Sequence, residues 1–296
     1  MNATEDSLVG TSARFRRRRR VDRWLGRLLP FTFLLVILPL LDMVYWIATR
    51  ALPTFSWATL TTNPSGTSGG LYGPIVGSAE ILAISTTIAA AIGIAGGIYT
   101  AEFASERMAA TVRFTTNLLA GVPSIVVGYF GYFALVLYFG WGASLIAGSV
   151  TLSIFILPYV FRSADLAFAS VPKDLREASL GMGSTRVQYI RRVAFPVALP
   201  QVLNGVFLAM AIGLGETAPL LYTAFWNNFP PTGLNQPVGY LTGLIWNYYD
   251  EPLSFGTEVT MAFQAAFILM VVVIVLNLAI RIIGGIYARR LRGLYH

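Results

Sequence analysis

The stretch from Val171 to Pro200, VPKDLREASLGMGSTRVQYIRRVAFPVALP, is the longest polar interruption in an otherwise apolar chain. Pro172 suits the first turn of a helix, because its missing N–H would be unpaired there anyway. Gly181 and Gly183 can end that helix, since glycine adopts a left-handed backbone without a Cβ clash. The first half of the stretch therefore predicts a short helix that stops at a glycine hinge.

The second half of the stretch predicts another helix. Ser184 can cap its start by accepting a bond from a free backbone N–H, and we expect it to run to about Ala194. Pro196 and Pro200 are expected to close the unit. Two short helices with a glycine hinge, set between apolar segments, are typical of a docking element for something outside the membrane.

The spacing of this stretch resembles the cytoplasmic loop of ABC importer membrane subunits. That loop carries Glu-Ala-Ala, then Gly after three residues, then nine residues and an Ile-x-Leu-Pro-like close. This chain has Ser for the second Ala and closes with Val193-Ala194-Phe195-Pro196. The resemblance implies coupling to a cytoplasmic ATPase through a matching set of positions, namely Glu177, Ala178, Ser179, Gly183 and Pro196.

Composition places the chain in the membrane. Of its 296 residues, 55% are hydrophobic and 12% are charged, whereas soluble domains carry about 25% charged residues. The absence of cysteine excludes disulfides and thiolate metal sites, and the single histidine, His296, argues against histidine catalysis. We expect an all-α polytopic protein with no catalytic residue and no metal site.

The first span follows a strongly basic segment. Residues 14–27 hold eight arginines, including the run Arg16–Arg20. The apolar segment 28–48 is long enough to cross a bilayer, which takes about 20 residues. Because no small-residue cleavage site is evident, we interpret it as an uncleaved span that keeps the arginines in the cytoplasm.

Hydropathy predicts five more spans. The 48 residues from Phe114 to Phe161 carry no charge, and they are expected to form two helices that turn near Gly140-Trp141-Gly142. The remaining spans are expected at Ile75–Tyr99, Val197–Leu221 and Val259–Ile282. The outer loop before the second span could hold a short interfacial helix near Trp57.

Basic residues predict the orientation. With both termini in the cytoplasm, all of the 21 Lys and Arg residues except Arg50 fall inside, as the positive-inside rule requires. The basic excess therefore reports topology and not nucleic-acid binding. The predicted parts are a basic tail (1–27), a first helix with its outer loop (28–74), a transporter domain (75–285) and a basic tail (286–296).

Glu216 is the outstanding polar residue inside the spans, where charged groups are costly and tend to be functional. It lies in the segment Gly213–Pro219, GLGETAP, whose glycines allow close approach and whose proline frees a backbone carbonyl. A helix broken here would offer N–H and C=O groups to a transported ion. The alternative is that Glu216 is satisfied by a neighbouring helix and serves packing only.

Segments Gly215–Pro219, Leu119–Val126 and Val171–Ser179 resemble phosphate-specific ABC importers, the Pst permease family, in their A-type membrane subunit. Ile212 departs from the family, which commonly has Arg there. The resemblance implies a six-helix type I ABC importer permease architecture. It also implies a set of translocation or gating residues, namely Glu216, Thr217, Pro219, Arg162 and Ser124. Packing alone is the alternative role for Ser124, Gly121 and Gly128.

The resemblance implies a function, partners and a location in the inner or plasma membrane. The chain would form half of a phosphate pore with a second, C-type permease, two copies of an ATP-binding subunit and an external phosphate-binding protein. It has no Gly-x-x-x-x-Gly-Lys-Ser/Thr loop, so the partner ATPase would use the ATP and Mg, and this chain would bind no cofactor. Alternatives are a permease for molybdate, sulfate or phosphonate, and a sensor or scaffold subunit. A channel would not explain the two-helix loop, and an intramembrane hydrolase would need a partner for Glu216.

Overall fold

The computed structural model describes residues 6–65, 68–250 and 256–292, and the chain divides into two compact units, residues 1–53 and 54–296. The first unit is one long helix, α1 (Asp6–Ala51), which continues through Pro30 and Pro39. Apolar side chains on it, among them Phe31 and Leu41, are exposed, as expected of a helix that faces lipid. The predicted first span lies within it.

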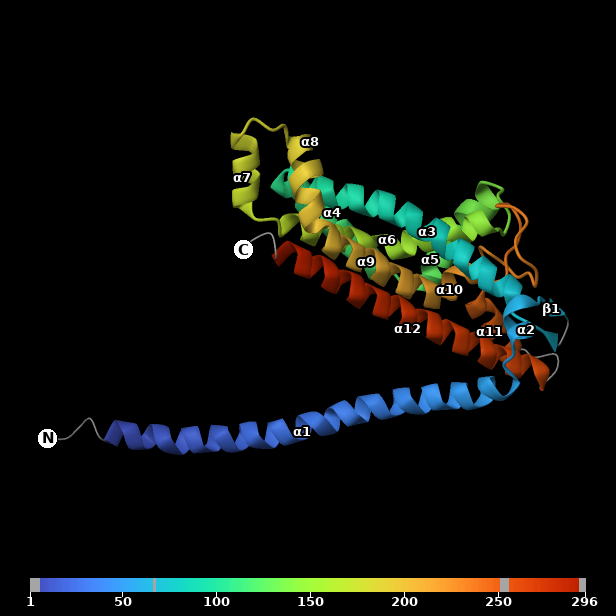
Figure 1. Ribbon diagram of the computed structural model, residues 1–296, viewed down its shortest axis with the longest axis horizontal. Helices are drawn as coiled ribbons and strands as arrows, with labels where there is room; N and C mark the ends of the chain where they lie inside the picture. Colours follow the sequence, from blue (N-terminus) through green and yellow to red (C-terminus); the bar gives the residue numbers. More distant parts are fainter. Residues whose placement is uncertain (1–5, 66–67, 251–255, 293–296) are drawn as a thin grey trace. The chain divides into compact units, whose positions relative to one another are not determined.

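The second unit is almost entirely helical (Figure 1). The turn η1 (Leu52–Thr54) leads from α1 into this unit. Near the start of the unit, a short antiparallel hairpin with two residues in each strand, β1 (Pro64–Ser65) and β2 (Ser68–Gly69), precedes the first long helix. The helices are α2 (Trp57–Thr61), α3 (Tyr72–Ile98), α4 (Glu106–Ala120), α5 (Ser124–Gly131), α6 (Leu145–Ala169), α7 (Lys173–Gly181), α8 (Arg186–Tyr189), α9 (Phe195–Gly215), α10 (Ala218–Leu221), α11 (Leu241–Asp250) and α12 (Thr257–Arg292). Three π-helical segments are described between them: η2 (Tyr99–Phe103), η3 (Tyr132–Tyr138) and η4 (Ile190–Ala194).

Helix α6 is at the centre of this unit, because it packs against both α3 and α9. The core there is made of buried aliphatic side chains, including Ile81, Leu152 and Ile156. Small residues bring the backbones together: a Cβ added at Gly97 would come within 2.6 Å of Ala164 Cβ. Such small-residue contacts are the usual means of close helix packing in membranes.

The uncharged run forms two segments on either side of the predicted turn. We expected one helix before the turn, and the structure adds a bend of 95° between α4 and α5 within that segment. Pro123 explains the bend, since the residue before a proline avoids the helical region and Pro123 itself is extended, with ψ 138°. The turn at Gly140 and Gly142 is confirmed, and both glycines have positive φ, 68° and 67°.

The second docking helix does not close where we expected. Thr185, not Ser184, is its cap, and its hydroxyl accepts from Gln188 N while the Gln188 side chain accepts from Thr185 N. The helix then continues from Arg186 to Gly215 through η4. The π-helical turn interrupts the regular ladder just before Pro196, so the helix passes through this proline instead of ending. Pro200 also lies inside the helix.

The predicted break in the fifth span is confirmed. Helix α9 ends at Gly215, Glu216 is extended (φ −77°, ψ 134°), and the four-residue helix α10 follows. Five described helices are long and apolar enough to cross a membrane, and the bent pair of α4 with α5 and η3 brings the number to six. The described helices thus give five spans, and six when the bent pair is counted as one span.

Two features lie in the segments that we expected outside the membrane. The short helix expected near Trp57 is present as α2. Helix α11 was not predicted, and it packs with α12 around a second core that includes Leu244, Tyr248 and Met261. Its ten residues are too few for a span, and hydropathy therefore gave no signal for it.

Candidate functional site

The predicted docking element is present at one end of the second unit, as the pair α7 and α8 (Figure 1). Glu177 and Ala178 are exposed on α7, whereas Ser179 is buried. The turn between the helices contains Gly183 with φ +85°, so the predicted glycine hinge is confirmed. Pro196 lies apart from this turn, in the first turn of α9.

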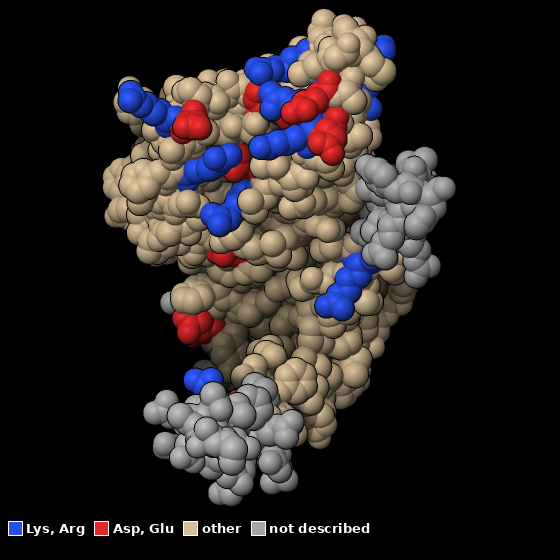
Figure 2. Space-filling view, turned by 90° about the vertical axis from the view of Figure 1, so that its left-hand side faces the viewer, with Lys and Arg blue, Asp and Glu red and all other residues tan. Residues whose placement is uncertain are grey.

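This end of the molecule carries charge. Figure 2 looks at it and shows basic and acidic side chains gathered together on its upper part, above a surface that is mostly uncharged. Helix α7 supplies both signs, with Lys173, Asp174, Arg176 and Glu177 within two turns. An exposed helix of mixed charge at the end of an apolar bundle can dock on a soluble partner.

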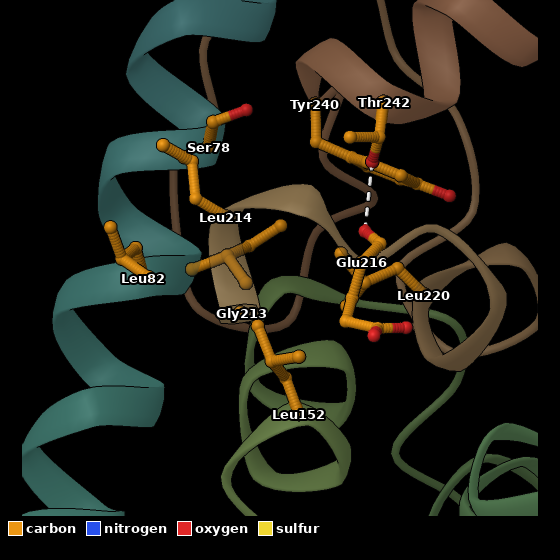
Figure 3. A pocket seen from close by; sticks show the side chains of 10 residues that line it. Ser78, Leu82, Leu152, Gly213, Leu214, Glu216, Leu220, Tyr240 and Thr242 are labelled. Carbon is orange, nitrogen blue, oxygen red and sulfur yellow. Dashed lines mark hydrogen bonds between the residues drawn. The ribbon is translucent and has the colours of Figure 1, made fainter. Parts of the chain in front are cut away.

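Hydrogen bonds from threonine side chains to backbone carbonyls hold the helix break at Glu216, and Figure 3 shows the bond to Glu216 itself. The Glu216 carbonyl accepts from Thr242 Oγ1 at 2.9 Å. The Pro219 carbonyl accepts from Thr223 Oγ1 at 2.6 Å. Pro219 has no N–H to offer the carbonyl of Gly215. The break is thus a built feature, stabilised by threonine side chains that replace the missing helical bonds.

The Glu216 side chain turns away from Thr242 (Figure 3). The hydroxyl of Ser124, the first residue of α5, interacts with the Glu216 carboxylate. Helices α5 and α10 are in backbone contact beside this pair, since a Cβ added at Gly128 would lie 2.7 Å from the Ala218 carbonyl oxygen. Four predicted residues therefore come together here, namely Ser124, Glu216, Thr217 and Pro219. Among the described residues, no basic side chain forms an ion pair with Glu216.

A cavity of about 10 Å³ lies on the other side of the Glu216 backbone. Polar groups of Ser78, Tyr240 and Thr242 line it together with aliphatic side chains such as Leu82. Ser78 Oγ also accepts from Leu241 N at 2.8 Å. The cavity is too small for an oxyanion, so it is part of the framework of the break and not a substrate site.

Arg162 lies in a different pocket, of about 450 Å³, between α4 and α6. Its Nη1 donates to Asn117 Oδ1 at 2.8 Å. Beside it, Arg113 holds Asp165 through two parallel bonds, Nε to Oδ2 at 2.7 Å and Nη2 to Oδ1 at 2.8 Å. Arg113 is thus neutralised by a carboxylate, whereas the described partner of Arg162 is a neutral amide. The pocket keeps one net positive charge.

Sequence reasoning missed three residues of this pocket, Arg113, Asn117 and Asp165. Their spacing contains a signal, because Arg113 and Asn117 are four apart and Arg162 and Asp165 are three apart. Residues at these separations share one helix face. What the sequence does not contain is the pairing of the two faces, which belong to helices 45 or more residues apart.

Comparison with known proteins identifies the family. A family model described as "Binding-protein-dependent transport system inner membrane component" matches residues 93–293. The chain belongs to this family. A relative, the phosphate transport system permease protein PstA 2 of Mycobacterium bovis, is 38% identical over 257 residues, 86% of this chain and 85% of that protein. The phosphate transport system permease protein PstA of Haemophilus influenzae is 32% identical over 81% of this chain and 85% of its own length.

Solved structures agree with the predicted fold. The chain is similar to a subunit of the MetNI methionine ABC transporter, with a TM-score of 0.58 and 20% identity over 72% of this chain and 94% of that one. It is also similar to a chain of a bacterial ABC transporter involved in import of the acidic polysaccharide alginate, with a TM-score of 0.59 and 16% identity over 93% and 99%. The ABC importer permease fold is confirmed, and at these identities the likeness is evidence for the fold alone.

The hinge at Gly183 gives a test of the docking element. Gly183→Val forces a β-branched residue into the left-handed region, which costs L-residues about 1–2 kcal/mol, although no neighbour lies within 4 Å of the added Cβ. We expect the chain to insert normally while copurification of its ATPase falls. Gly181→Val is the matched control, since Gly181 is also open on all sides and its φ is not positive. Equal copurification for both variants would show that the turn geometry does not matter.

Glu216 can be tested by removing only its charge. Glu216→Gln retains the shape of the side chain and removes its charge. A charge at span depth costs roughly 2.5–3.5 kcal/mol on insertion scales, so a charge kept there is expected to have a function. If the charge is used in transport, uptake should fall at least about tenfold while the amount of assembled complex stays constant. Ser124→Ala removes the hydroxyl that faces Glu216 and should give a smaller loss. Normal uptake by Glu216→Gln would assign Glu216 to packing.

Proposed function

We propose that this chain is a permease subunit of an ATP-driven importer of inorganic phosphate and that it forms half of the translocation pore. The observation that carries the proposal is the match to phosphate permeases over more than four fifths of the chain. A pocket with one net positive charge, at Arg162, is consistent with an anionic substrate.

Arg162 is the residue that would meet the anion. A guanidinium offers a planar fork of N–H donors that fits phosphate oxygens, and such charge-assisted bonds are about twice as strong as neutral ones. Asn117 orients the fork without neutralising it. Arg113 is committed to Asp165 and would mainly hold α4 against α6.

Glu216 would act as a gate and not as a ligand. A carboxylate repels phosphate, and the break around Glu216 is held at the contact of α5 with α10. We infer that an arginine of the second, C-type permease pairs with Glu216, since this chain has Ile212 where the family resemblance implies an arginine. Thr217 and Pro219 would maintain the break so that the gate can form.

Energy would come from partner subunits. Two copies of an ATP-binding subunit would hydrolyse ATP with Mg, and α7 with α8 would dock on them through Glu177, Ala178, Ser179 and the Gly183 turn. An external binding protein would deliver phosphate. The chain itself would bind no cofactor.

Both termini would lie in the cytoplasm, because that orientation leaves only Arg50 among 21 basic residues outside. A tag at His296 should therefore be inaccessible to a membrane-impermeant reagent in intact cells and accessible after lysis. A tag inserted after Trp57 should already be accessible in intact cells. A C-terminal tag that reacts in intact cells would overturn this topology.

Phosphate uptake decides the substrate. A strain that lacks this chain should lose high-affinity phosphate uptake and regain it from the wild-type gene. The gene for Arg162→Gln should restore an uptake rate at least about tenfold lower than the wild-type gene does, because the variant loses about one charge-assisted hydrogen bond to the anion. Arg107→Gln, an exposed arginine on α4, is the control and should restore uptake fully. Unchanged phosphate uptake with loss of molybdate, sulfate or phosphonate uptake would assign the chain to that anion.

A further inference from the structure

The π-helical segment η2, at the end of α3, contains a buried carboxylate that the proposed transport path does not use. The Glu102 side chain is only 4% exposed. Burying an unpaired carboxylate is very costly, so a charge retained at this position has to be compensated. Its partners come from the docking element.

Both helices of the docking element reach η2. Arg176 of α7 approaches Glu102 Oε2 with Nη2 at 3.6 Å. The phenol of Tyr189 on α8, itself 1% exposed, lies beside the same carboxylate. Arg186, also on α8, places its guanidinium over the Phe103 ring, 5.4 Å from the centroid. Three contacts from two helices thus converge on one turn.

These contacts reach a helix to which the docking element is not directly joined in sequence. Helix α7 follows α6 and α8 leads into α9, so a displacement of the docking element reaches those two helices through the backbone. Helix α3 is not joined to the docking element in sequence. It packs against α6, and its described ion pair with α7 is Glu102–Arg176. At its other end, α3 contributes Ser78 and Leu82 to the cavity behind Glu216 (Figure 3).

We propose that Glu102 is a positioning residue that couples the docking helices to α3, with η2 as the joint that transmits their movement toward the Glu216 break. The proposal rests on the function proposed above, since it assumes that α7 and α8 dock on an ATPase. The Glu102 side chain is 4% exposed and that of Arg176 is 34% exposed, and a pair with a buried member is screened by water and salt less than a fully exposed one. The joint is also adaptable, because a π-helical turn departs from the regular helical ladder, and such turns are frequent at functional sites.

One detail indicates that the pair is poised for movement. Glu102 Oε2 has no hydrogen bond among the described residues, and its contact with Arg176 is 3.6 Å, longer than an optimal charge-assisted bond of about 2.7–2.9 Å. A shift of α7 toward η2 would shorten it. Docking of a partner on α7 can therefore shorten this contact. The ion pair would then be stronger in the docked state than in the undocked state, and coupling requires such a difference in free energy between two states.

The experiment uses the complete complex, purified through a tag on this chain with its ATPase and reconstituted in proteoliposomes. ATPase rates with and without the binding protein, and phosphate transported per ATP hydrolysed, are measured for Glu102→Gln, Arg176→Gln, the double variant and Arg176→Lys. Glu106→Gln is the matched control, an exposed glutamate four residues further on. Tyr189→Phe removes only the phenolic hydroxyl and serves if the charge variants fail to assemble.

We expect Glu102→Gln to lower the transport per ATP about tenfold, within the range of coupling changes made by such network residues, while the ATPase still copurifies. Arg176→Gln should be worse than the double variant, because it leaves a buried carboxylate unpaired. Arg176→Lys should recover part of the coupling, Tyr189→Phe should lower it mildly, and Glu106→Gln should match the wild type. The proposal would be overturned if Glu102→Gln transported as much phosphate per ATP as the wild type, or if Tyr189→Phe did so where Glu102→Gln cannot be assembled. It would also be overturned if the effects of the two single variants simply added in the double variant.

The two proposals fail in different ways. If the wild-type complex transports another anion, phosphate is the wrong substrate, but the ratio of stimulated to basal ATPase activity still reports the joint. If wild-type transport of phosphate is normal and that ratio is unaffected by Glu102→Gln, the joint is wrong and the phosphate assignment stands.

Discussion

A polar backbone group inside a membrane has to find its partner within the protein, and the structure of the second unit depends on how two helix breaks meet that requirement. The α4–α5 break follows Pro123, and the α9–α10 break contains Glu216. The breaks come together where Gly128 packs directly on Ala218 and Pro219. Thr223 and Thr242 supply the hydrogen bonds that the interrupted helices have lost. Irregular backbone of this kind is tolerated at membrane depth only where protein or a water-filled cavity surrounds it.

Charged side chains meet the same requirement for a partner within the protein. Arg113 with Asp165 and Arg176 with Glu102 bind pairs of elements that are distant in the sequence. Each pair has one well-buried carboxylate and one partly exposed arginine, so the arginine can reach water while it neutralises the buried partner. Arg162 differs, because its described partner is the amide of Asn117. No described carboxylate balances its charge, and this is the physical reason for proposing that an anionic substrate meets Arg162.

The sequence predicted the class of the protein and the position of most spans for simple reasons. Hydropathy and length are local properties, and so is the preference of Gly183 for a left-handed turn, which the structure has at φ +85°. The break at Glu216 was also predictable, since glycines and Pro219 in one short segment weaken any helix. The prolines misled us at Pro196, because whether a proline ends a helix depends on the turn that precedes it, here the π-helical segment Ile190–Ala194.

The sequence by itself determined that this chain crosses the membrane several times, that a polar two-helix element interrupts the spans and that Glu216 lies at a helix break. Only the tertiary structure decided which charges meet. The partners Arg113 and Asp165 are 52 residues apart, and Arg176 is distant from Glu102 as well. A pattern along the chain shows which residues share a helix face, but two faces are brought together by the packing of small residues such as Gly97 against Ala164. That packing is a property of the whole helix bundle, and no single segment contains it.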